Sequence, residues 1–215
     1  MPATLIHLVR HGEVHNPDRV LYGRLPGFGL SDLGHRMAER AAAHLQGRTI
    51  VKLYASPLQR TQESAKPWSD RFGLEITTDE RLIEPHNKFE GRRASFGPGL
   101  LTQPETWPWM SNPRRPSWGE PFVDIAARML SVVHDAWSSV DDGEVVLVTH
   151  QLPIWMVHRS VNGKKLYHDP RRRRCSLSSI TTLEYRESAP TSFAEIDYQD
   201  PAADLLAESV DLGAV

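Results

Sequence analysis

Short apolar runs, each ended by a polar residue, constrain the fold of this chain most strongly. The run Leu5–Val9 ends on Arg10-His11-Gly12, and the run Val145–Thr149 ends on His150. Such short, almost entirely apolar runs are typical of strands buried on both faces of a parallel sheet. Open α/β sheets bind ligands at the carboxyl ends of their strands, so these polar residues are expected to line a site.

Strand-like and helix-like segments alternate along the chain. Strands are expected at residues 4–9, 51–55, 75–78, 145–149 and 178–185, and helices at 32–45, 58–72, 122–140 and 153–161. Ser31 can cap the first of these helices, whereas Pro67 is expected to kink or split the second. The alternation predicts an α/β fold, a three-layer sandwich with a mostly parallel central sheet flanked by helices.

Length and charge limit the classes of function. The 215 residues suffice for one core, and a net charge of −2 gives no general reason to expect binding to nucleic acid or to a membrane surface. Cys175 is the single cysteine, which fits a reducing compartment, and no secretory signal is recognisable, so a cytoplasmic location is expected. Residues 1–199 are expected to form one domain, followed at 200–215 by an acidic tail that is frayed or forms a short surface helix.

Several residue types at the predicted strand ends suit an anionic substrate. Arg10 offers phosphate a rigid fork of donors, and His11 can be a nucleophile near neutral pH. Arg60 lies in the first turn of the helix that follows Ser56-Pro57, where free backbone amides and the helix dipole favour an anion. Taken alone, however, Arg60 has the features of a surface helix residue.

Four motifs, in the same order, resemble the histidine phosphatase superfamily, the phosphoglycerate mutase-like proteins. They are Arg10-His11-Gly12-Glu13, Ser56-Pro57-Leu58-Gln59-Arg60 with Ser64-Ala65, Glu84 with Phe89-Glu90-Gly91, and Thr149-His150. The resemblance implies that His11 is phosphorylated during turnover. It also implies that Arg10, Arg60 and His150 hold the phosphoryl group and that Glu84 protonates the leaving oxygen. Glu90 is the competing candidate for that acid.

The chain departs from the family pattern beside two of these motifs. The family usually has Ser or Thr three residues after the nucleophile and Asn six after it; this chain has Val14 and Pro17 there, with Asn16 one residue early. Asn16 is expected to bind the substrate, and Gly23 is expected to let a backbone N–H approach the phosphate. Gln151 replaces the glycine that usually follows the second histidine and is expected to line the pocket.

The motifs predict a phosphatase that needs no cofactor and no metal, and that hydrolyses a phosphomonoester through a phosphohistidine on His11. No His-Glu-x-x-His motif or clustered Cys/His spacing is present. The expected substrate is a small phosphorylated metabolite or a phosphopeptide. Two alternatives remain: phosphoryl transfer of the phosphoglycerate mutase type, or a catalytically weak phosphate-binding module. The family's mutases carry a His-Tyr-Gly run where this chain has Pro85–Phe89, which favours hydrolysis, although Arg114-Arg115 resemble the mutases' paired arginines.

An inserted cap is expected at about residues 86–121. It contains many prolines and the tryptophans Trp107, Trp109 and Trp118. Long connections of this kind are usually functional, and aromatic faces on a restricted backbone would select the substrate. A surface loop that packs its own aromatics is the alternative. The run Arg171–Arg174 is expected to be an exposed segment that leads into the last strand.

Overall fold

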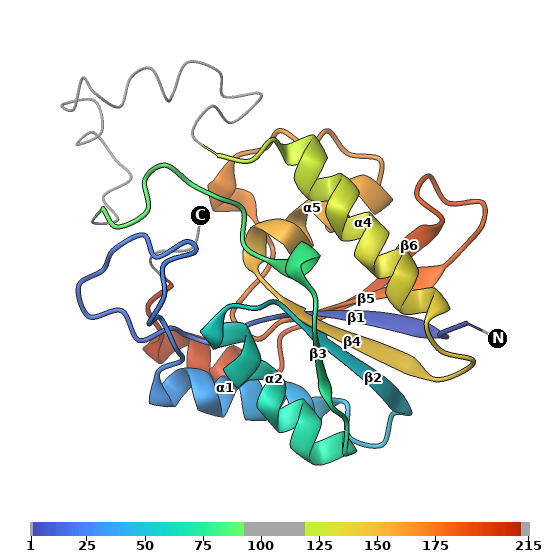
Figure 1. Ribbon diagram of the computed structural model, residues 1–215, viewed down its shortest axis with the longest axis horizontal. Helices are drawn as coiled ribbons and strands as arrows, with labels where there is room; N and C mark the ends of the chain where they lie inside the picture. Colours follow the sequence, from blue (N-terminus) through green and yellow to red (C-terminus); the bar gives the residue numbers. More distant parts are fainter. Residues whose placement is uncertain (1, 93–118, 212–215) are drawn as a thin grey trace.

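A computed structural model describes residues 2–92 and 119–211 and confirms the predicted α/β class (Figure 1). The strands are β1 (Leu5–Arg10), β2 (Ile50–Ala55), β3 (Ile76–Thr78), β4 (Glu144–Thr149), β5 (Ile180–Tyr185) and β6 (Phe193–Gln199). The α-helices are α1 (Asp32–His44), α2 (Gln59–Phe72), α4 (Phe122–Ser138) and α5 (Gln151–Val161). Short 3-10 helices are η1 (Glu80–Leu82), η3 (Pro170–Arg172) and η4 (Ala203–Glu208).

The six strands form one mixed sheet in the order β3-β2-β4-β1-β5-β6. Strands β3, β2, β4 and β1 run parallel, whereas β5 is antiparallel to β1 and β6 is antiparallel to β5. The mostly parallel sheet was predicted, but β6 was not. Its residues are largely polar and half-buried because it pairs on one side only, so it lacks the apolar run that marks the central strands.

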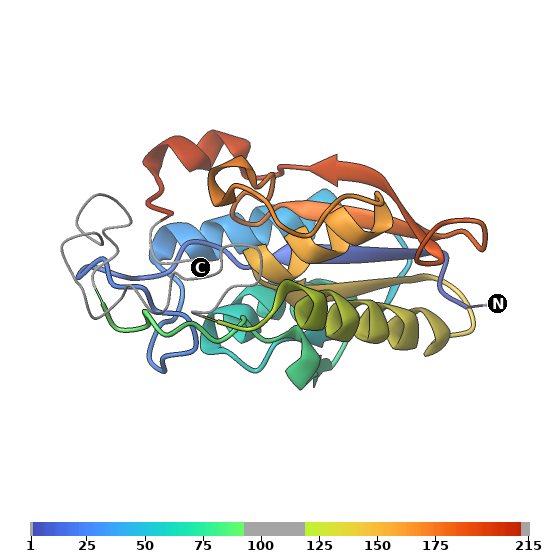
Figure 2. The ribbon, with the colours of Figure 1, turned by 90° about the horizontal axis from the view of Figure 1, so that it is seen from above.

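Helices cover both faces of the sheet, as Figures 1 and 2 show together. Along β1, Ile6 and Leu8 belong to the core beneath α4 and α5, whereas Val9 belongs to the core beneath α1 and α2. This alternation follows from the two-residue period of a strand, and it explains why the whole run is apolar.

The first two helices show how local sequence sets element bounds. The Ser31 hydroxyl accepts a hydrogen bond from the Gly34 amide at 3.0 Å, which confirms the predicted cap of α1. Pro67 lies inside α2 without splitting it, so of the two expectations the split is excluded and the kink stays a prediction. A proline removes one backbone donor, while Ala65 and Trp68 keep this helix packed on the sheet.

Strand register places the predicted catalytic residues at one edge. Arg10 of β1 pairs with Thr149 of β4, and the His11 amide continues the ladder by donating to the Thr149 carbonyl at 3.1 Å. On the other side of β4, the Ser56 amide donates to the Val148 carbonyl at 3.0 Å. The residues that follow three adjacent strands therefore meet at the carboxyl edge of the sheet.

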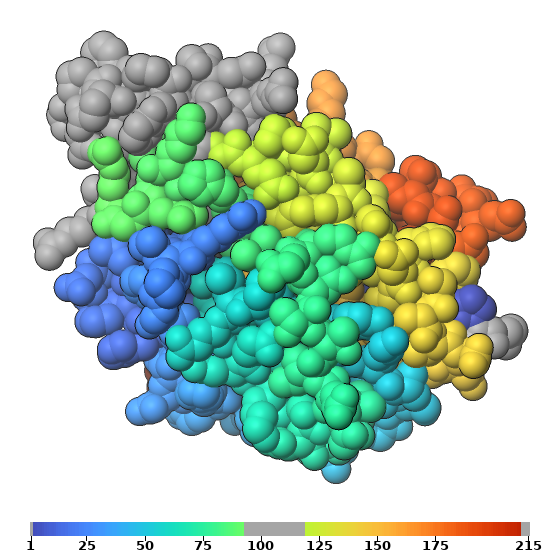
Figure 3. All heavy atoms as spheres, viewed as in Figure 1, coloured from blue at the N-terminus to red at the C-terminus, as the bar shows by residue number. Residues whose placement is uncertain are grey.

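The expected cap lies largely outside the described residues, and so do its three tryptophans and Arg114-Arg115. Its two flanks are described. Asn87 and Gly119 form an antiparallel bridge, and the Gly91 amide donates to the Leu21 carbonyl at 2.8 Å. In Figure 3 the segment near Gly91 (green) lies against the loop that follows β1 (blue). The flanks are thus held beside each other and beside that loop.

The C-terminal segment follows β6 back along the molecule. Within the acidic tail, η4 lies beside α1, as Figure 2 shows, and Leu205 packs against Met37 and Leu177. Residues 203–208 therefore adopt the short helix that was one of the two expectations, and residues 212–215 lie outside the described part. In the described ranges no helix has the length and apolar character needed to cross a membrane.

Candidate active site

His11 has the geometry of a nucleophile. Its Nδ1 lies 2.8 Å from the Gly12 carbonyl oxygen, which only accepts, so Nδ1 carries the proton and Nε2 carries the lone pair. Burial, followed by the charges of Arg60 and Arg10, lowers the pKa of His11 well below 6.5. The imidazole is consequently neutral at neutral pH, as nucleophilic attack requires.

The backbone after His11 is fixed by close packing. The Gly12 amide donates to the Ser64 hydroxyl at 3.1 Å, which ties this turn to α2. A Cβ on Gly12 would lie 2.4 Å from the Gly34 carbonyl oxygen, so no side chain fits there without a shift of backbone. The Ser31 hydroxyl donates to the Glu13 carboxylate at 2.5 Å, which joins the same turn to the start of α1. Contacts with two helices, α1 and α2, thereby set the position of the His11 ring.

His150 lies beside His11, with 5.2 Å between the ring centroids. Its Nε2 is 2.8 Å from the Ser56 hydroxyl, which leaves Nδ1 facing the site, 3.3 Å from Arg60 Nη2 and 3.3 Å from Glu84 Oε2. Burial and the Arg60 charge lower the pKa of His150 well below 6.5. The contact with Glu84 therefore involves a neutral imidazole and is not an ion pair.

Two buried arginines supply the positive charge of the site. Arg60 donates to the Gly23 carbonyl at 2.8 Å, and its guanidinium lies over the Tyr22 ring at 4.8 Å. Arg10 donates to the Cys175 carbonyl at 2.7 Å and to both carboxylate oxygens of Asp211. Both side chains lie at the carboxyl edge of the sheet, where the sequence predicted two arginines that bind phosphate.

Glu84 is the carboxyl group best placed to exchange a proton. It is buried, and burial raises its pKa even though nearby arginines, Arg60 first among them, oppose the rise. Arg24 donates to the Glu84 carbonyl at 2.5 Å and holds the backbone in place. The rival, Glu90, accepts the Asn87 amide at 3.1 Å and packs against Gly23. Glu84, which contacts His150, is therefore the better candidate for the acid.

Three buried polar atoms of this cluster have no hydrogen-bond partner among the described residues: Nε of Arg10, Nε of Arg60 and Oε1 of Glu84. Unpaired buried polar atoms are costly and need an explanation. Two unused guanidinium donors beside one carboxyl oxygen suit a phosphate ester, whose oxygens accept from the first two and take a proton from the third. Among residues 2–92 and 119–211, no group of three or more His, Cys, Asp or Glu side chains is arranged to hold a metal ion.

The three expected substrate ligands have different surroundings. The Asn16 amide closes its own loop, donating to the Val20 carbonyl at 2.8 Å and accepting its amide at 3.1 Å. Gly23, with a φ of 40°, directs its carbonyl to Arg60. Gln151 donates to the Cys175 carbonyl at 3.4 Å and accepts from Arg173 at 3.3 Å. Gly23 and Gln151 thus touch arginines of the site, and substrate contact stays a prediction for all three.

Sequence reasoning missed Arg173. The run Arg171–Arg174 was expected to be exposed, and three of its members are, but Arg173 is half-buried and its charge acts on Glu84. Its Nε donates to His168 Nε2 at 2.9 Å, and burial lowers the pKa of His168 to about 4, so that ring is a neutral acceptor. Four consecutive arginines carry no signal that singles out the third. The hydrogen bond between Ser56 and His150 could not be predicted either, because it depends on the register of β2 and β4.

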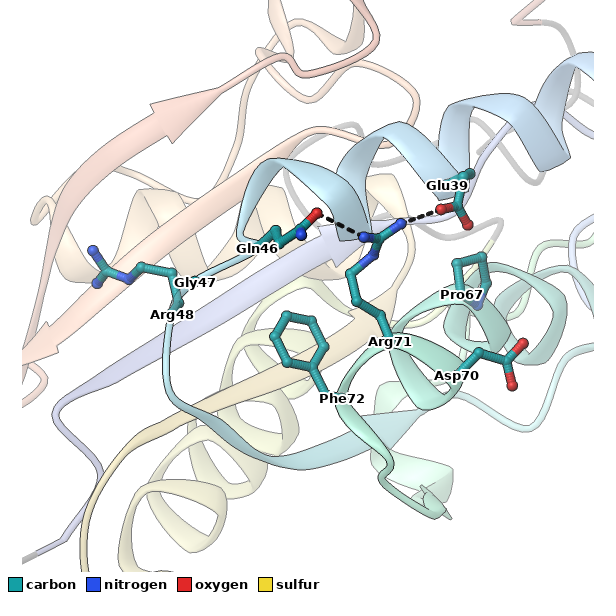
Figure 4. A pocket seen from close by; sticks show the side chains of 8 residues that line it. All are labelled: Glu39, Gln46, Gly47, Arg48, Pro67, Asp70, Arg71 and Phe72. Carbon is teal, nitrogen blue, oxygen red and sulfur yellow. Dashed lines mark hydrogen bonds and ion pairs between the residues drawn. The ribbon is translucent and has the colours of Figure 1, made fainter.

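A surface hollow elsewhere on the molecule holds none of these residues (Figure 4). It lies at the carboxyl ends of α1 and α2, at the opposite end of the sheet from His11. Its Arg71 donates to Gln46 at 2.8 Å and also pairs with Glu39, so its charge is already balanced. Its lining consists of Glu39, Gln46, Gly47, Arg48, Pro67, Asp70, Arg71 and Phe72.

Comparison with known proteins identifies the family. The sequence profile of the histidine phosphatase superfamily (branch 1) matches residues 6–194. The chain belongs to this superfamily. The match spans all five predicted catalytic positions from Arg10 to His150. The chain is therefore an enzyme of the histidine phosphatase superfamily with a phosphoglycerate mutase-like fold.

Similar proteins include both phosphatases and mutases by name. An uncharacterised protein of Mycobacterium tuberculosis is 50% identical over 200 residues, which cover 93% of this chain and 98% of that protein. A probable phosphoglycerate mutase of Yersinia enterocolitica is 29% identical over 189 residues, covering 85% and 86%. Among solved structures, a mycobacterial glucosyl-3-phosphoglycerate phosphatase has a TM-score of 0.74 at 25% identity, covering 92% of this chain and 98% of its own.

The buried histidines predict how stability depends on pH. The pKa values of His11 and His150 are lowered in the folded protein, so below pH 6.5 the unfolded chain binds protons that the folded protein does not. The stability that the folded protein has while both histidines are neutral is complete above pH 6.5 and is lost on acidification. The free energy of unfolding should fall by up to about 1.4 kcal/mol per pH unit for each histidine.

Urea unfolding of the wild type and of His11→Gln at pH 8, 7, 6 and 5 measures this contribution. The unfolding free energy of the wild type minus that of His11→Gln should be constant above pH 7. It should decrease below pH 6.5, because the wild type loses stability faster. Parallel curves over the whole range would show that His11 is not held neutral.

Proposed function

We propose that this enzyme hydrolyses a phosphomonoester of a small molecule through a phosphohistidine on His11, with arginine cations in the role that a metal ion has in other phosphatases. The observation that carries the proposal is a neutral histidine whose Nε2 lone pair is available beside two buried guanidinium groups. Glu84, a carboxyl with a raised pKa, lies in the same cluster. Nucleophile, charge stabilisation and acid are thus present together.

In the first step, Nε2 of His11 attacks phosphorus in line with the ester oxygen. The P–N bond forms as the P–O bond breaks, and the electron pair goes to the leaving oxygen, which takes the proton of Glu84. The transition state spreads negative charge over three equatorial oxygens. Arg10 and Arg60 are placed to stabilise that charge, because both guanidinium groups act electrostatically on His11 and on Glu84. His150 donates to the same oxygens in the tautomer that has its proton on Nδ1, with Nε2 accepting from the Ser56 hydroxyl.

In the second step, water replaces the departed alcohol. The Glu84 carboxylate accepts a proton from this water, whose oxygen attacks phosphorus. The P–N bond breaks, its electron pair returns to Nε2, and inorganic phosphate is released. Glu84 is protonated again, so the enzyme is ready for another cycle. A pKa raised by burial but opposed by nearby arginines suits a group that must both donate and accept a proton.

The nucleophile can be tested by trapping. Brief incubation with a ³²P-labelled ester followed by alkaline quenching should leave label on the wild type, because phosphohistidine survives base. His11→Ala should carry no label and should lose activity on p-nitrophenyl phosphate. Label on His11→Ala would mean that another residue is the nucleophile. Phosphate binding without turnover of any ester by the wild type would favour the weak binding module.

A pair of arginine variants tests the charge clamp. Arg60→Ala should lower kcat/KM on large and small esters alike by a factor on the order of 10²–10³, since every ester shares the phosphoryl group. Arg71→Ala removes an arginine from the hollow in Figure 4 and should leave kcat/KM unchanged. An equal loss of kcat/KM in both variants would contradict a specific role of Arg60 in binding the phosphoryl group. Thermal unfolding of both variants then measures whether lost stability explains the loss of activity.

Phosphoryl transfer of the mutase type is the second candidate, favoured by the likeness to a probable phosphoglycerate mutase. Incubation with 3-phosphoglycerate and a trace of 2,3-bisphosphoglycerate separates the two activities. We expect inorganic phosphate to appear faster than 2-phosphoglycerate when both are followed by ³¹P NMR. Rapid isomerisation with little release of phosphate would establish the mutase reaction instead.

A further inference from the structure

The C-terminal segment delivers a carboxylate to the phosphate site. Asp211 lies 201 positions after Arg10 in the chain, yet its Oδ1 accepts from Arg10 Nη2 at 2.6 Å and its Oδ2 accepts from Nη1 at 2.8 Å. Two parallel hydrogen bonds from one guanidinium are the arrangement by which arginine binds phosphate as well as carboxylate. Asp211 therefore occupies both terminal nitrogens of an arginine to which the proposed mechanism assigns the phosphoryl group, and only Nε of Arg10 is left without a hydrogen-bond partner in the described residues.

The difference in burial between the two partners indicates which of them can move. The Arg10 side chain is 0% exposed, whereas that of Asp211 is 37% exposed. Burial lowers the pKa of Arg10, but the Asp211 carboxylate outweighs this effect and the pKa lies above its ordinary value. A buried cation needs an anion close by. Asp211 can leave toward solvent if another anion replaces it, and a phosphoryl group is such an anion.

The segment that carries Asp211 is held by contacts that can break without opening the core. The Val210 amide donates to Glu13 Oε1 at 2.6 Å. Before it, Glu208 and Asp204 of η4 pair with arginines of α1 at 3.4 and 3.3 Å, and both pairs are exposed. Exposed pairs contribute little, so the burial of Leu205 is the main anchor of η4. Residues 209–211 extend from this anchor to the site.

We propose that the carboxylate of Asp211 is an internal competitor for the phosphate subsite, so that residues 209–211 must release Arg10 before a phosphoryl group binds there. The inference concerns regulation of the site and rests on its proposed role in binding phosphate esters. It follows that apparent affinity for phosphate is the intrinsic affinity multiplied by the fraction of molecules whose C-terminal segment has released Arg10. Any partner that holds the segment away would activate the enzyme.

Asp211→Asn is the sharpest variant, because an amide of the same size has one acceptor oxygen and turns an N–H group toward Arg10. Isothermal titration with inorganic phosphate should show a dissociation constant about tenfold lower than in the wild type, if the segment occupies the site in nine molecules of ten. Asp70→Asn, at the hollow in Figure 4, should leave the constant unchanged. An unchanged or weaker affinity of Asp211→Asn for phosphate would overturn the proposal.

Movement of the segment is tested separately from removal of its charge. The Val210 amide is protected from hydrogen exchange only while it donates to Glu13. Saturating phosphate should speed its exchange in the wild type and should have no further effect in Asp211→Asn. Exchange that phosphate leaves unchanged in the wild type would mean that Asp211 repels the ligand without leaving. Both measurements follow binding alone, so they stand even if no ester is hydrolysed.

Discussion

Two guanidinium groups buried at the carboxyl edge of a parallel sheet govern the properties of this site. Arg10 and Arg60 are almost completely removed from water. Their charge, added to burial, keeps His11 and His150 neutral, because a protonated imidazole beside them would be a third buried cation. The same charge limits how far the pKa of Glu84 rises. The protonation states of the proposed nucleophile and the proposed acid, and the expected affinity for anions, therefore share one electrostatic cause.

The central position of β4 makes that arrangement possible. It pairs with β1 on one side and β2 on the other, so the residues after all three strands share one edge. The hydrogen bonds that fix the register also fix the distance between the rings of His11 and His150. The geometry of the site is consequently as well determined as the apolar core beneath it. Substitutions that change the packing of that core are expected to shift the residues of the site.

Much of this arrangement could be predicted because the signals are local. Apolar runs that stop at Arg10 and His150 mark both strands and site, and the motif around Arg60 distinguishes it from an ordinary surface arginine. What could not be predicted depends on contacts between distant segments. Asp211 belongs to an acidic tail whose composition indicates only solvation, and Arg173 is one of four equivalent arginines. Their positions follow from packing that joins η3 and η4 to the rest of the molecule.

The paired flanks of the long connection before α4 have an evolutionary consequence. The bridge between Asn87 and Gly119 holds the two ends of residues 88–118 together independently of what lies between them. The entropy of closing a loop grows only slowly with its length, so insertions or deletions between those ends change stability little. Selection can therefore change the sequence and length of that stretch while the sheet edge keeps its geometry. Wide variation in that stretch among proteins that keep the same sheet edge is the outcome that such an anchoring permits.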